Sequence, residues 1–436
     1  MKLLHHNSSH CMSDNLNLFE VPPTQTAIES CRIVTVSPIS TVTSTGPVEW
    51  LIQGSSEEYV DVSETFMEIK AKCVNDQGNL ATSTDAIAPA NATLAAMFSQ
   101  CMVSLNDIPI THASSTYAYK AIIDMHMNYD WEAKRSVLQT AQYYKDDNIS
   151  NPDPKSTTKP NKGLVKRHKL CCAEKEFTLV GRIHSDVFDI SKYIPNGVDI
   201  KIKMIRSRSN FAMMGGGSIH ITGAKLHVRK VFLTPSLLMA NERLAMKESM
   251  KFFYTRTEIK VLHVDAKKRG HTQDNIFIGA LPQRVVLCMV DSDAFNGDYT
   301  KNPFEFNHFK VTSMCLCVDG RNIPATPLQG NFSTGDYARF YYTMYTETIG
   351  LKSRSGGGGI TMDEYLNGHA FFCFDLTPDL SSSCGNHLNV AKTGNMGVDI
   401  TFEEALSSHM NILMYSEFEG LFEMNHERRV ISEVSS

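Results

Sequence analysis

Three aspartates in the second half of the chain, Asp291, Asp293 and Asp298, lie close together around Asn296-Gly297. Carboxylates at such short spacing could hold a calcium ion, because this hard cation prefers oxygen ligands. The segment lacks the glutamate and the spacing of an EF-hand loop, and Asn-Gly beside aspartates is also a turn signal. A cation site and a plain turn are both compatible with these residues, and the turn is the simpler interpretation.

A run of three glycines, Gly215-Gly216-Gly217, is a weak candidate for a phosphate cradle. It lacks a following lysine and helix, so a flexible turn explains it more simply. The sequence contains no Gly-x-x-x-x-Gly-Lys-Ser/Thr phosphate loop, no His-Glu-x-x-His motif and no Gly-x-Ser-x-Gly nucleophile elbow. We therefore expect that the chain is not an enzyme, with no catalytic residue, no cofactor and no metal site.

A basic segment could contact nucleic acid; its residues are Lys155, Lys159, Lys162, Lys166, Arg167 and Lys169. A nuclear import signal or an inward-facing DNA contact is one interpretation of this segment, and a solvated loop is the other. The formal net charge of −5 gives the whole chain no field that would attract a polyanion. A protein that coats DNA directly would be more basic.

Histidines and aromatic residues give no further catalytic signal. His184, His220 and His227 lie in strand patterns, which predicts ordinary sheet residues rather than ligands. The run Phe340-Tyr341-Tyr342 lacks the interleaved basic residues of a base-stacking platform, so we expect it in the core or an interface. The remaining histidine cluster, His5, His6 and His10, belongs to a polar stretch that predicts a mobile tail.

The composition is that of an ordinary globular protein, with 42% hydrophobic and 20% charged residues among 436. The eleven cysteines include no Cys-x-x-Cys pair, and Cys315 and Cys317 are spaced to share one face of a strand. No apolar run reaches the roughly 18 residues of a membrane span, and the N-terminus has no signal-peptide core. These features predict a reducing, intracellular setting with free thiols and no membrane span.

The elements that carry these residues occur twice. Three short phrases recur in the same order in the two halves, which predicts two diverged copies of one domain. The matched phrases are Asn106-Asp107-Ile108-Pro109 with Arg321-Asn322-Ile323-Pro324, Tyr117-Ala118 with Tyr337-Ala338, and Phe188-Asp189-Ile190-Ser191 before Gly197-Val198-Asp199-Ile200 with Phe374-Asp375-Leu376-Thr377 before Gly397-Val398-Asp399-Ile400. The offset between copies drops midway, so the first copy has extra residues, which we place in a long loop at about 146–175.

Strand signals dominate each copy, separated by polar turns at regular spacing, and this pattern is typical of a sandwich or barrel. The clearest lie at residues 31–36, 48–52, 59–62, 65–73, 200–205, 219–228, 400–402 and 410–415. In residues 65–73 we expect Phe66, Ile69, Ala71 and Cys73 on one face. Helices are predicted only at 88–99, 118–129 and 236–250. We divide the chain into a tail at 1–14, a domain at 15–235, a linker helix at 236–250 and a domain at 251–436.

Several stretches resemble the major capsid proteins of Polinton (Maverick) elements and adintovirus-like viruses. The most specific is Val290-Asp291-Ser292-Asp293-Ala294-Phe295-Asn296-Gly297-Asp298-Tyr299-Thr300-Lys301-Asn302-Pro303-Phe304. Further similar stretches lie at residues 19–26, 46–49, 104–107, 281–286 and 374–380. The resemblance covers nearly everything from residue 14 to residue 430. It implies an all-β double jelly roll, in which two eight-stranded antiparallel sandwiches follow one another with a few short helices in the connections.

The same resemblance implies a structural role. Three copies would form a homotrimeric capsomer with a pseudo-sixfold outline, and neighbouring capsomers would tile an icosahedral shell that encloses double-stranded DNA. Penton and minor capsid proteins are further partners that the family implies. The location would be the virion, after an intracellular stage in the host before assembly, for which the nucleus is one candidate compartment. A carbohydrate-binding jelly-roll module is the alternative function, because the same sandwich also serves lectins.

Overall fold

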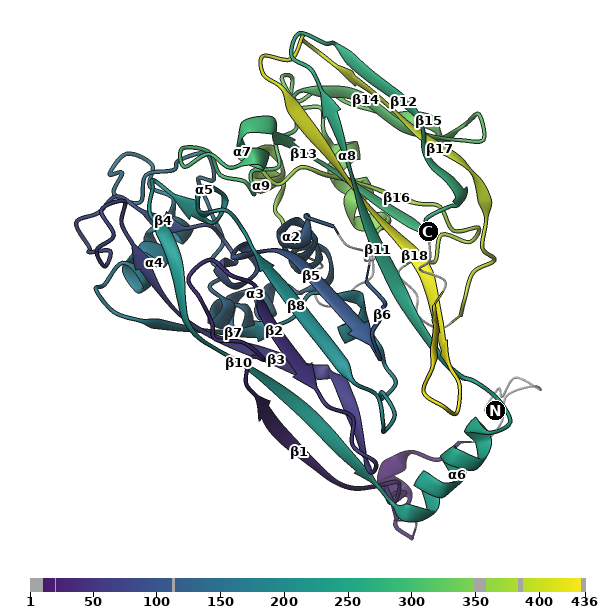
Figure 1. Cartoon of the computed structure of the whole chain (residues 1–436). Coiled ribbons are helices and arrows are strands. Elements are labelled where there is room, and N and C mark those ends of the chain that lie inside the picture. Colours follow the sequence, from purple (N-terminus) through teal and green to yellow (C-terminus); the bar gives the residue numbers. More distant parts are fainter. Residues whose placement is uncertain (1–10, 20, 112–113, 349–357, 383–386, 433–436) are drawn as a thin grey trace.

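The computed structural model describes residues 11–19, 21–111, 114–348, 358–382 and 387–432 (Figure 1). Each half of the chain forms two four-stranded antiparallel sheets, and β19 extends one sheet of the second half. The strands of the first half are β1 (Ile28–Val36), β2 (Val48–Ile52), β3 (Glu58–Val74), β5 (Phe98–Leu105), β6 (Ile108–Pro109), β7 (Phe177–Arg182), β8 (Ile200–Arg206) and β10 (Ser218–Leu233). A separate pair joins β4 (Ala88–Pro89) to β9 (Met213–Met214).

The second half repeats this set of strands. They are β11 (Met250–Val264), β12 (Gly270–Ala280), β13 (Arg284–Asp291), β14 (Val311–Val318), β15 (Arg321–Gln329), β16 (Phe371–Asp375), β17 (Thr393–Phe402), β18 (Met410–Met424) and β19 (Val430–Ser432). The sheets run β1-β10-β3-β7 and β2-β8-β5-β6 in the first half, and β11-β18-β13-β16 and β12-β17-β14-β15 in the second. If the eight sandwich strands of each half are numbered in chain order, one sheet has the order first-eighth-third-sixth and the other second-seventh-fourth-fifth. The two halves share this order, which confirms the two eight-stranded sandwiches.

Two of the recurring phrases lie close to equivalent places in the two sandwiches, with a shift of one or two residues. Asn106 and Asp107 turn the chain between β5 and β6 with positive φ angles of 46° and 65°, and Asp319 and Gly320 do the same between β14 and β15. Tyr117 begins helix α2 (Tyr117–Asn128), just as Tyr337 caps helix α8 (Ala338–Thr346). The repeat is approximate at this turn and this helix start. The Phe-Asp phrase differs, since it lies in a 3₁₀ turn after β7 in the first half and within β16 in the second.

The remaining helices are short and lie in connections. They are α1 (Thr93–Ala96), α3 (Trp131–Arg135), α4 (Lys162–Cys171), α5 (Ser209–Ala212), α6 (Pro235–Ala245), α7 (Ser292–Asn296) and α9 (Met362–Leu366), with 3₁₀ turns η1 (Asp14–Leu16), η2 (Val137–Ala141) and η3 (Asp186–Asp189). The prediction for 118–129 is correct within one residue. Those for 88–99 and 236–250 are too long, because Phe98 pairs with β8 and Met250 pairs with β18.

The segment predicted as a long loop at 146–175 is in part a helix. Asn161 caps α4, and its side-chain oxygen accepts hydrogen bonds from the backbone N–H groups of Gly163 and Leu164. Arg167 lies on the buried face of this helix and is fully inaccessible to solvent. The low apolar content of the segment hid a helix whose buried face is partly polar.

Strand β3 joins two stretches that were predicted as separate strands. Irregular pairing with β10 between His227 and Arg229 lets β3 continue through residues 62–65. Met67, not Phe66, lies on the buried face with Ile69, Ala71 and Cys73. Strict alternation back from Cys73 gives Met67 on this face, and the bulge lies beyond it at residues 62–65.

Candidate assembly surface

The two sandwiches meet along an aromatic contact between α2 and the connection that contains α7. The buried ring of Tyr119 stacks on Phe295 with centroids 5.3 Å apart and meets Phe304 edge-on at 5.8 Å. Aromatic pairs at such separations contribute about 0.5–1.5 kcal/mol each beyond the area that they bury. The buried apolar residues of both sandwiches form one continuous cluster, so the two halves pack directly against each other.

Buried polar groups complete this junction. The Nζ of Lys134, on α3, donates to the carbonyl oxygen of His126 at 3.0 Å and to that of Gly358 in the second sandwich. Burial lowers the pKa of Lys134 to about 7 and that of His369 to about 4. The rings of His126 and His369 lie 5.1 Å apart across the junction. The contact therefore favours uncharged side chains where the two sandwiches meet.

A third contact comes from the turn between β18 and β19. Arg428 donates from Nε to the carbonyl oxygen of Asn196 at 2.8 Å and forms an ion pair with Glu242 on α6. The backbone carbonyl of Arg428 accepts a hydrogen bond from Asn106 at 2.8 Å. This turn of the second sandwich thus contacts the first sandwich and α6 at once.

A cleft of about 1040 Å³ lies between the sandwiches and is lined by residues of both. Its charges are paired within the chain: Asp124 Oδ2 lies 2.6 Å from His184 Nδ1, and Glu417 Oε1 lies 2.7 Å from Arg284 Nη2. Burial alone would raise the pKa of Asp124, but hydrogen bonds from His184 and Asn128 lower it. Among the described residues, no serine, threonine or cysteine side chain is hydrogen-bonded to His184, so a nucleophile paired with this histidine is missing there.

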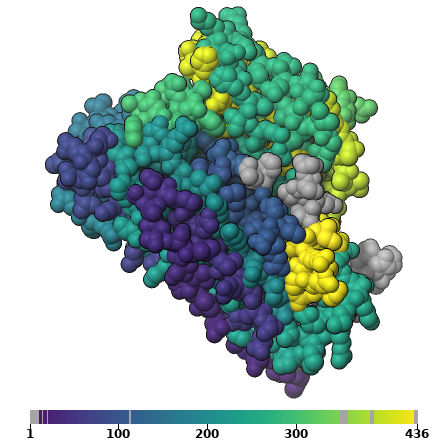
Figure 2. Space-filling model, in the orientation of Figure 1, coloured from purple at the N-terminus to yellow at the C-terminus, as the bar shows by residue number. Residues whose placement is uncertain are grey.

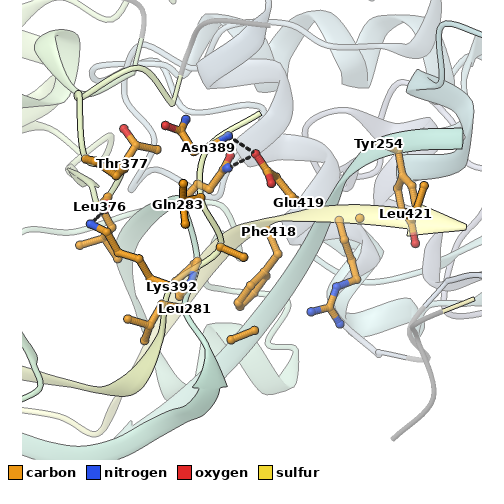
Figure 3. A pocket seen from close by; sticks show the side chains of 17 residues that line it. Tyr254, Leu281, Gln283, Leu376, Thr377, Asn389, Lys392, Phe418, Glu419 and Leu421 are labelled. Atoms are coloured by element: carbon orange, nitrogen blue, oxygen red, sulfur yellow. Dashed lines mark hydrogen bonds between the residues drawn. The ribbon is translucent and has the colours of Figure 1, made fainter. Parts of the chain in front are cut away.

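A smaller groove of about 250 Å³ lies in the second sandwich (Figure 3). Leu281, Leu376 and Phe418 contribute apolar walls, and Glu419 accepts hydrogen bonds from the Gln283 side chain and the Asn389 backbone N–H. The ammonium group of Lys392 donates to the Leu376 carbonyl oxygen at 3.0 Å. These polar groups form hydrogen bonds with one another, so their contacts stabilise the walls of the groove.

An exposed apolar surface lies at one end of the molecule, beside α6. Only Ala245 of the eleven residues of α6 is buried. The Thr234 N–H donates to the Ala27 carbonyl, which places the N-terminal segment beside the start of α6 (Figure 1). We call this region the basal surface, and its exposed apolar residues are Leu16, Leu18, Phe19, Val21, Met239, Leu244, Met246 and Ile431. Figure 2 shows the N-terminal segment, α6 and the C-terminal strands gathered there.

Two edge strands are also poorly covered. Strand β1 has no buried residue, and its apolar Ile33 is 63% exposed. In β12 only Phe277 is buried, and Ile278 is 77% exposed. Edge strands offer unpaired backbone groups and are a liability in an isolated protein. Contiguous exposed apolar residues usually mark an interaction surface.

Comparison with known proteins identifies the architecture. No family model matches the chain. It is 22% identical to the uncharacterized protein F54H12.2 of Caenorhabditis elegans over 428 residues, 94% of this chain and 99% of that protein. It superposes on a chain of the Sputnik virophage structure with a TM-score of 0.66, at 10% identity over 99% of this chain and 94% of that one. The chain has the double jelly-roll fold.

Other double jelly rolls are similar over nearly the whole chain. The mavirus major capsid protein gives a TM-score of 0.57 at 13% identity, with 99% of this chain and 97% of that chain covered. The Faustovirus major capsid protein also gives 0.57, at 8% identity over 95% of this chain and 92% of that one. The double jelly roll that the sequence resemblance implied is confirmed.

Within the double jelly roll, the three aspartates around Asn296-Gly297 are engaged by the chain itself. Lys301 Nζ lies 2.9 Å from Asp291 Oδ1 and 2.8 Å from Asp293 Oδ2, and these two carboxylates raise the pKa of Lys301 to about 12. Asp298 accepts hydrogen bonds from Thr300 in a turn. An ammonium group therefore occupies the place that a cation would take.

The three glycines form the turn that was the simpler interpretation. All three have positive φ, and a Cβ at Gly215 would lie 2.1 Å from the Ala86 carbonyl oxygen. The Gly217 N–H donates to Asp76 Oδ1 at 2.8 Å. The concavity that could cradle a phosphate is thus filled by a carboxylate of the same chain.

The other residues that the sequence singled out are scattered. Arg167 is buried, whereas Lys155, Lys159, Lys162, Lys166 and Lys169 remain at the surface or close to it. His220 and His227 lie in β10 as predicted, but His184 follows the end of β7. Phe340 is buried in α8, and Tyr341 donates to the Ile360 carbonyl at 2.9 Å while Tyr342 is 55% exposed. His5, His6 and His10 lie outside the described residues.

Two smaller expectations complete the comparison. Cys315 is buried and Cys317 half-buried on β14, consistent with small residues in a sheet. None of the helices within the described ranges is long and apolar enough to cross a membrane. What the sequence did not locate is the basal surface, whose residues come from distant parts of the chain. The apolar spacing of α6 was a signal for it, but it did not say what that face covers.

Proposed function

We propose that this chain is the major structural subunit of a capsid. Three copies form a homotrimeric capsomer with a pseudo-sixfold outline, and capsomers assemble an icosahedral shell around double-stranded DNA. The observation that carries the proposal is the duplicated sandwich, because a trimer of two-sandwich subunits presents six similar walls. The likeness to the mavirus and Faustovirus major capsid proteins over nearly the whole chain supports it.

The surfaces of the chain suit such a role. The junction between the sandwiches is filled by aromatic and buried polar contacts, so one subunit can act as a single block. The exposed apolar residues lie at the basal surface and on edge strands, where copies of the chain would cover them. Obligate assemblies bury about 2,000–5,000 Å² with apolar centres. The net charge of −5 fits a shell that encloses DNA without coating it.

The neighbouring capsomers, penton and minor capsid proteins are part of the same proposal, as is the location in the virion. The basic segment near α4 adds only a few exposed lysines, so we assign it no sequence-specific DNA contact. DNA recognition of that kind would require side chains that reach base edges.

The proposal is tested by the mass and shape of the purified full-length chain. We expect light scattering to give three times the 48.7 kDa subunit mass, and negative-stain images to show hexagonal outlines or closed shells. Measurements at several protein concentrations separate a stable trimer from weak association. A chain that stays monomeric at every concentration, and binds sugars on a glycan array, would replace the capsid role with carbohydrate binding.

A further inference from the structure

Three metal-ligating side chains meet at the end of β11 and the start of β18, away from the surfaces described above. His263 is the next-to-last residue of β11, Asp265 follows the strand, and His409 directly precedes β18. The pairing of Val264 with Met410 and of His263 with Asn411 brings these positions together. They lie at the end of the second sandwich opposite α6, since β11 starts beside that helix and runs away from it (Figure 1).

The ligand atoms of the three residues converge. The imidazole rings are nearly parallel, with an interplanar angle of 14° and centroids 5.6 Å apart. Asp265 Oδ1 lies 3.6 Å from His263 Nε2 and 3.8 Å from His409 Nδ1, and all three atoms lie within 4.8 Å of one another. These separations are too long for hydrogen bonds, and they are ion-pair contacts only when the imidazoles are protonated.

Neighbouring groups set the orientation of each ligand. His263 Nδ1 lies 2.9 Å from Asn411 Oδ1, an acceptor that fixes the proton on Nδ1 and leaves the lone pair of Nε2 directed at Asp265. The Ala266 N–H donates to His409 Nδ1 at 3.4 Å, so this nitrogen is unprotonated, and an ion bound to it would replace this long hydrogen bond. Lys268 binds Asp265 Oδ2 at 2.9 Å, which leaves Oδ1 for the histidines. A hydrogen bond to the ligating histidine is a usual feature of metal sites.

We propose that His263, Asp265 and His409 bind a transition-metal ion of the zinc type. Imidazole nitrogen and carboxylate oxygen bind Zn²⁺ at about 2.0–2.2 Å, which in a tetrahedral site places ligand atoms roughly 3.3–3.5 Å apart. The two distances to Asp265 Oδ1 exceed this separation by only a few tenths of an ångström. The histidine ligand atoms lie within 4.8 Å of each other, so the two nearly parallel rings would turn toward the ion as it binds. Three protein ligands leave the fourth position open to water. The Lys268 ammonium group opposes the ion, so the site would be weaker than a buried structural zinc site.

The site is accessible and does not depend on the capsid role. The side chains of His263, Asp265 and His409 are 52%, 56% and 59% exposed. An ion can therefore enter without any rearrangement of the sandwich. Because the three residues belong to one chain, binding requires no second copy. Failure of zinc binding would leave the proposed assembly untouched, and failure of assembly would leave the metal site untouched.

The test is a calorimetric titration of the full-length chain with Zn²⁺. The tail histidines His5, His6 and His10 could chelate the ion themselves, so all variants carry them as alanine. In this background we expect one equivalent of bound zinc. The substitutions H263A and H409A should each weaken binding by about 100-fold, and N411A by about 10-fold or more, as for loss of a group that orients a ligand. The matched control is H271A, which removes a half-buried histidine of β12 outside the cluster.

A second readout separates the site from nonspecific chelation. Co²⁺ in a tetrahedral site absorbs visible light strongly, so the parent should gain d–d bands that are absent from the H263A/H409A double variant. Circular dichroism checks that the variants fold, which exposed positions should allow. The proposal is overturned if the parent binds no zinc, or if the double variant binds it with the same stoichiometry and Kd.

Discussion

At the level of single residues, the buried pair of Arg167 and Asp146 best shows why residue type alone misled the sequence interpretation. Arg167 Nη2 lies 3.0 Å from Asp146 Oδ1, and Nε donates to the Pro89 carbonyl at 2.9 Å. Burial raises the pKa of Asp146, while the charge of Arg167 opposes this rise. An arginine within a lysine-rich stretch was read as part of a basic segment, yet it organises the inserted segment from within.

We therefore expect R167A to destabilise the protein strongly. Removing the arginine leaves a buried carboxylate and the carbonyl groups of Pro89 and Tyr144 without this donor, which costs about 3–5 kcal/mol. Urea denaturation followed by tryptophan fluorescence and circular dichroism measures the loss. K169A, an exposed lysine on the same helix, is the matched control and should change stability by less than about 0.5 kcal/mol. Equal effects of the two substitutions would contradict the structural role of Arg167.

The buried histidine His369 predicts a loss of stability in acid. Burial lowers its pKa to about 4 in the folded protein, against an ordinary value of 6.5, and it faces His126, Lys134, Lys145 and Glu364. Between these pH values the unfolded chain binds a proton that the folded chain does not, so stability falls as the pH falls. The stabilisation is present above pH 6.5 and is lost progressively toward pH 4.

Substituting His369 should reduce the fall in unfolding free energy between neutral and acidic pH. Between pH 6.5 and pH 4.5 we expect the wild type to lose about 2 kcal/mol more unfolding free energy than H369Q, whose side chain does not titrate. Denaturation curves at several pH values provide the comparison. H426Q replaces an exposed histidine and should follow the wild type. Parallel curves for H369Q and the wild type would show that His369 titrates normally.

At the scale of elements, α2 is the helix that joins the sandwiches. Its position was predicted from apolar spacing almost to the residue, and its partner was not. Tyr119 contacts Phe295 and Phe304, about 180 residues later in the chain, and no local pattern reports such a contact. The sequence predicted which residues are apolar and which period they follow. It could not say whether an apolar face covers its own sandwich or the next one.

Truncation of this contact should loosen the junction. Y119A removes a buried ring from the shared core, and a large aromatic truncation of this kind costs about 3–5 kcal/mol. We expect earlier proteolytic cleavage in the connection around α6 and a lower urea midpoint. Y342A, which removes an exposed tyrosine on the equivalent helix α8, should leave both unchanged. If both variants resisted proteolysis equally, α2 would not hold the sandwiches together.

The predictability of the strands follows the same reasoning. Residues 48–52 were assigned correctly because alternating burial in β2 follows its sequence pattern. The helix predicted at 236–250 ends earlier in the structure, because Met250 pairs with Met424 of β18, far along the chain. Helix α4 was missed because its buried face includes Arg167 and His168, polar residues that obscure the apolar period. Long-range pairing and buried polar groups thus account for these errors.

At the scale of the whole molecule, the duplicated strand order would let three copies of the chain supply the six walls of the proposed capsomer. Each sandwich keeps the order first-eighth-third-sixth and second-seventh-fourth-fifth, while the connections differ. In that capsomer, three duplicated chains would give a near-sixfold outline with only three identical contacts, in a closed cyclic arrangement. Divergent connections let the two walls of one subunit make different contacts. The shared strand order records this duplication, whereas closure of the proposed ring would involve other copies.

The basal surface leads to a prediction about assembly. Phe19 is 96% exposed and Met246 is 73% exposed, so neither side chain stabilises the isolated subunit. If copies of the chain cover them, F19S/M246S should weaken association and leave the urea midpoint of the monomer unchanged. Burying a side chain of this size contributes about 1.5–3 kcal/mol, so two losses per contact should raise the Kd by at least 100-fold. Light scattering across a concentration series measures the shift.

The matched control is V137S, which removes an exposed apolar residue from η2. This turn packs beside β7, at the opposite edge of the sheet from β1, and Val137 is 60% exposed. If the basal surface carries the contact, V137S assembles like the wild type while F19S/M246S does not. Loss of assembly in both variants would instead indicate that any reduction in surface hydrophobicity weakens association. Normal assembly of F19S/M246S would indicate that copies of the chain meet through the exposed edge strands β1 and β12 instead. Ile33 and Ile278 would then be the positions to substitute.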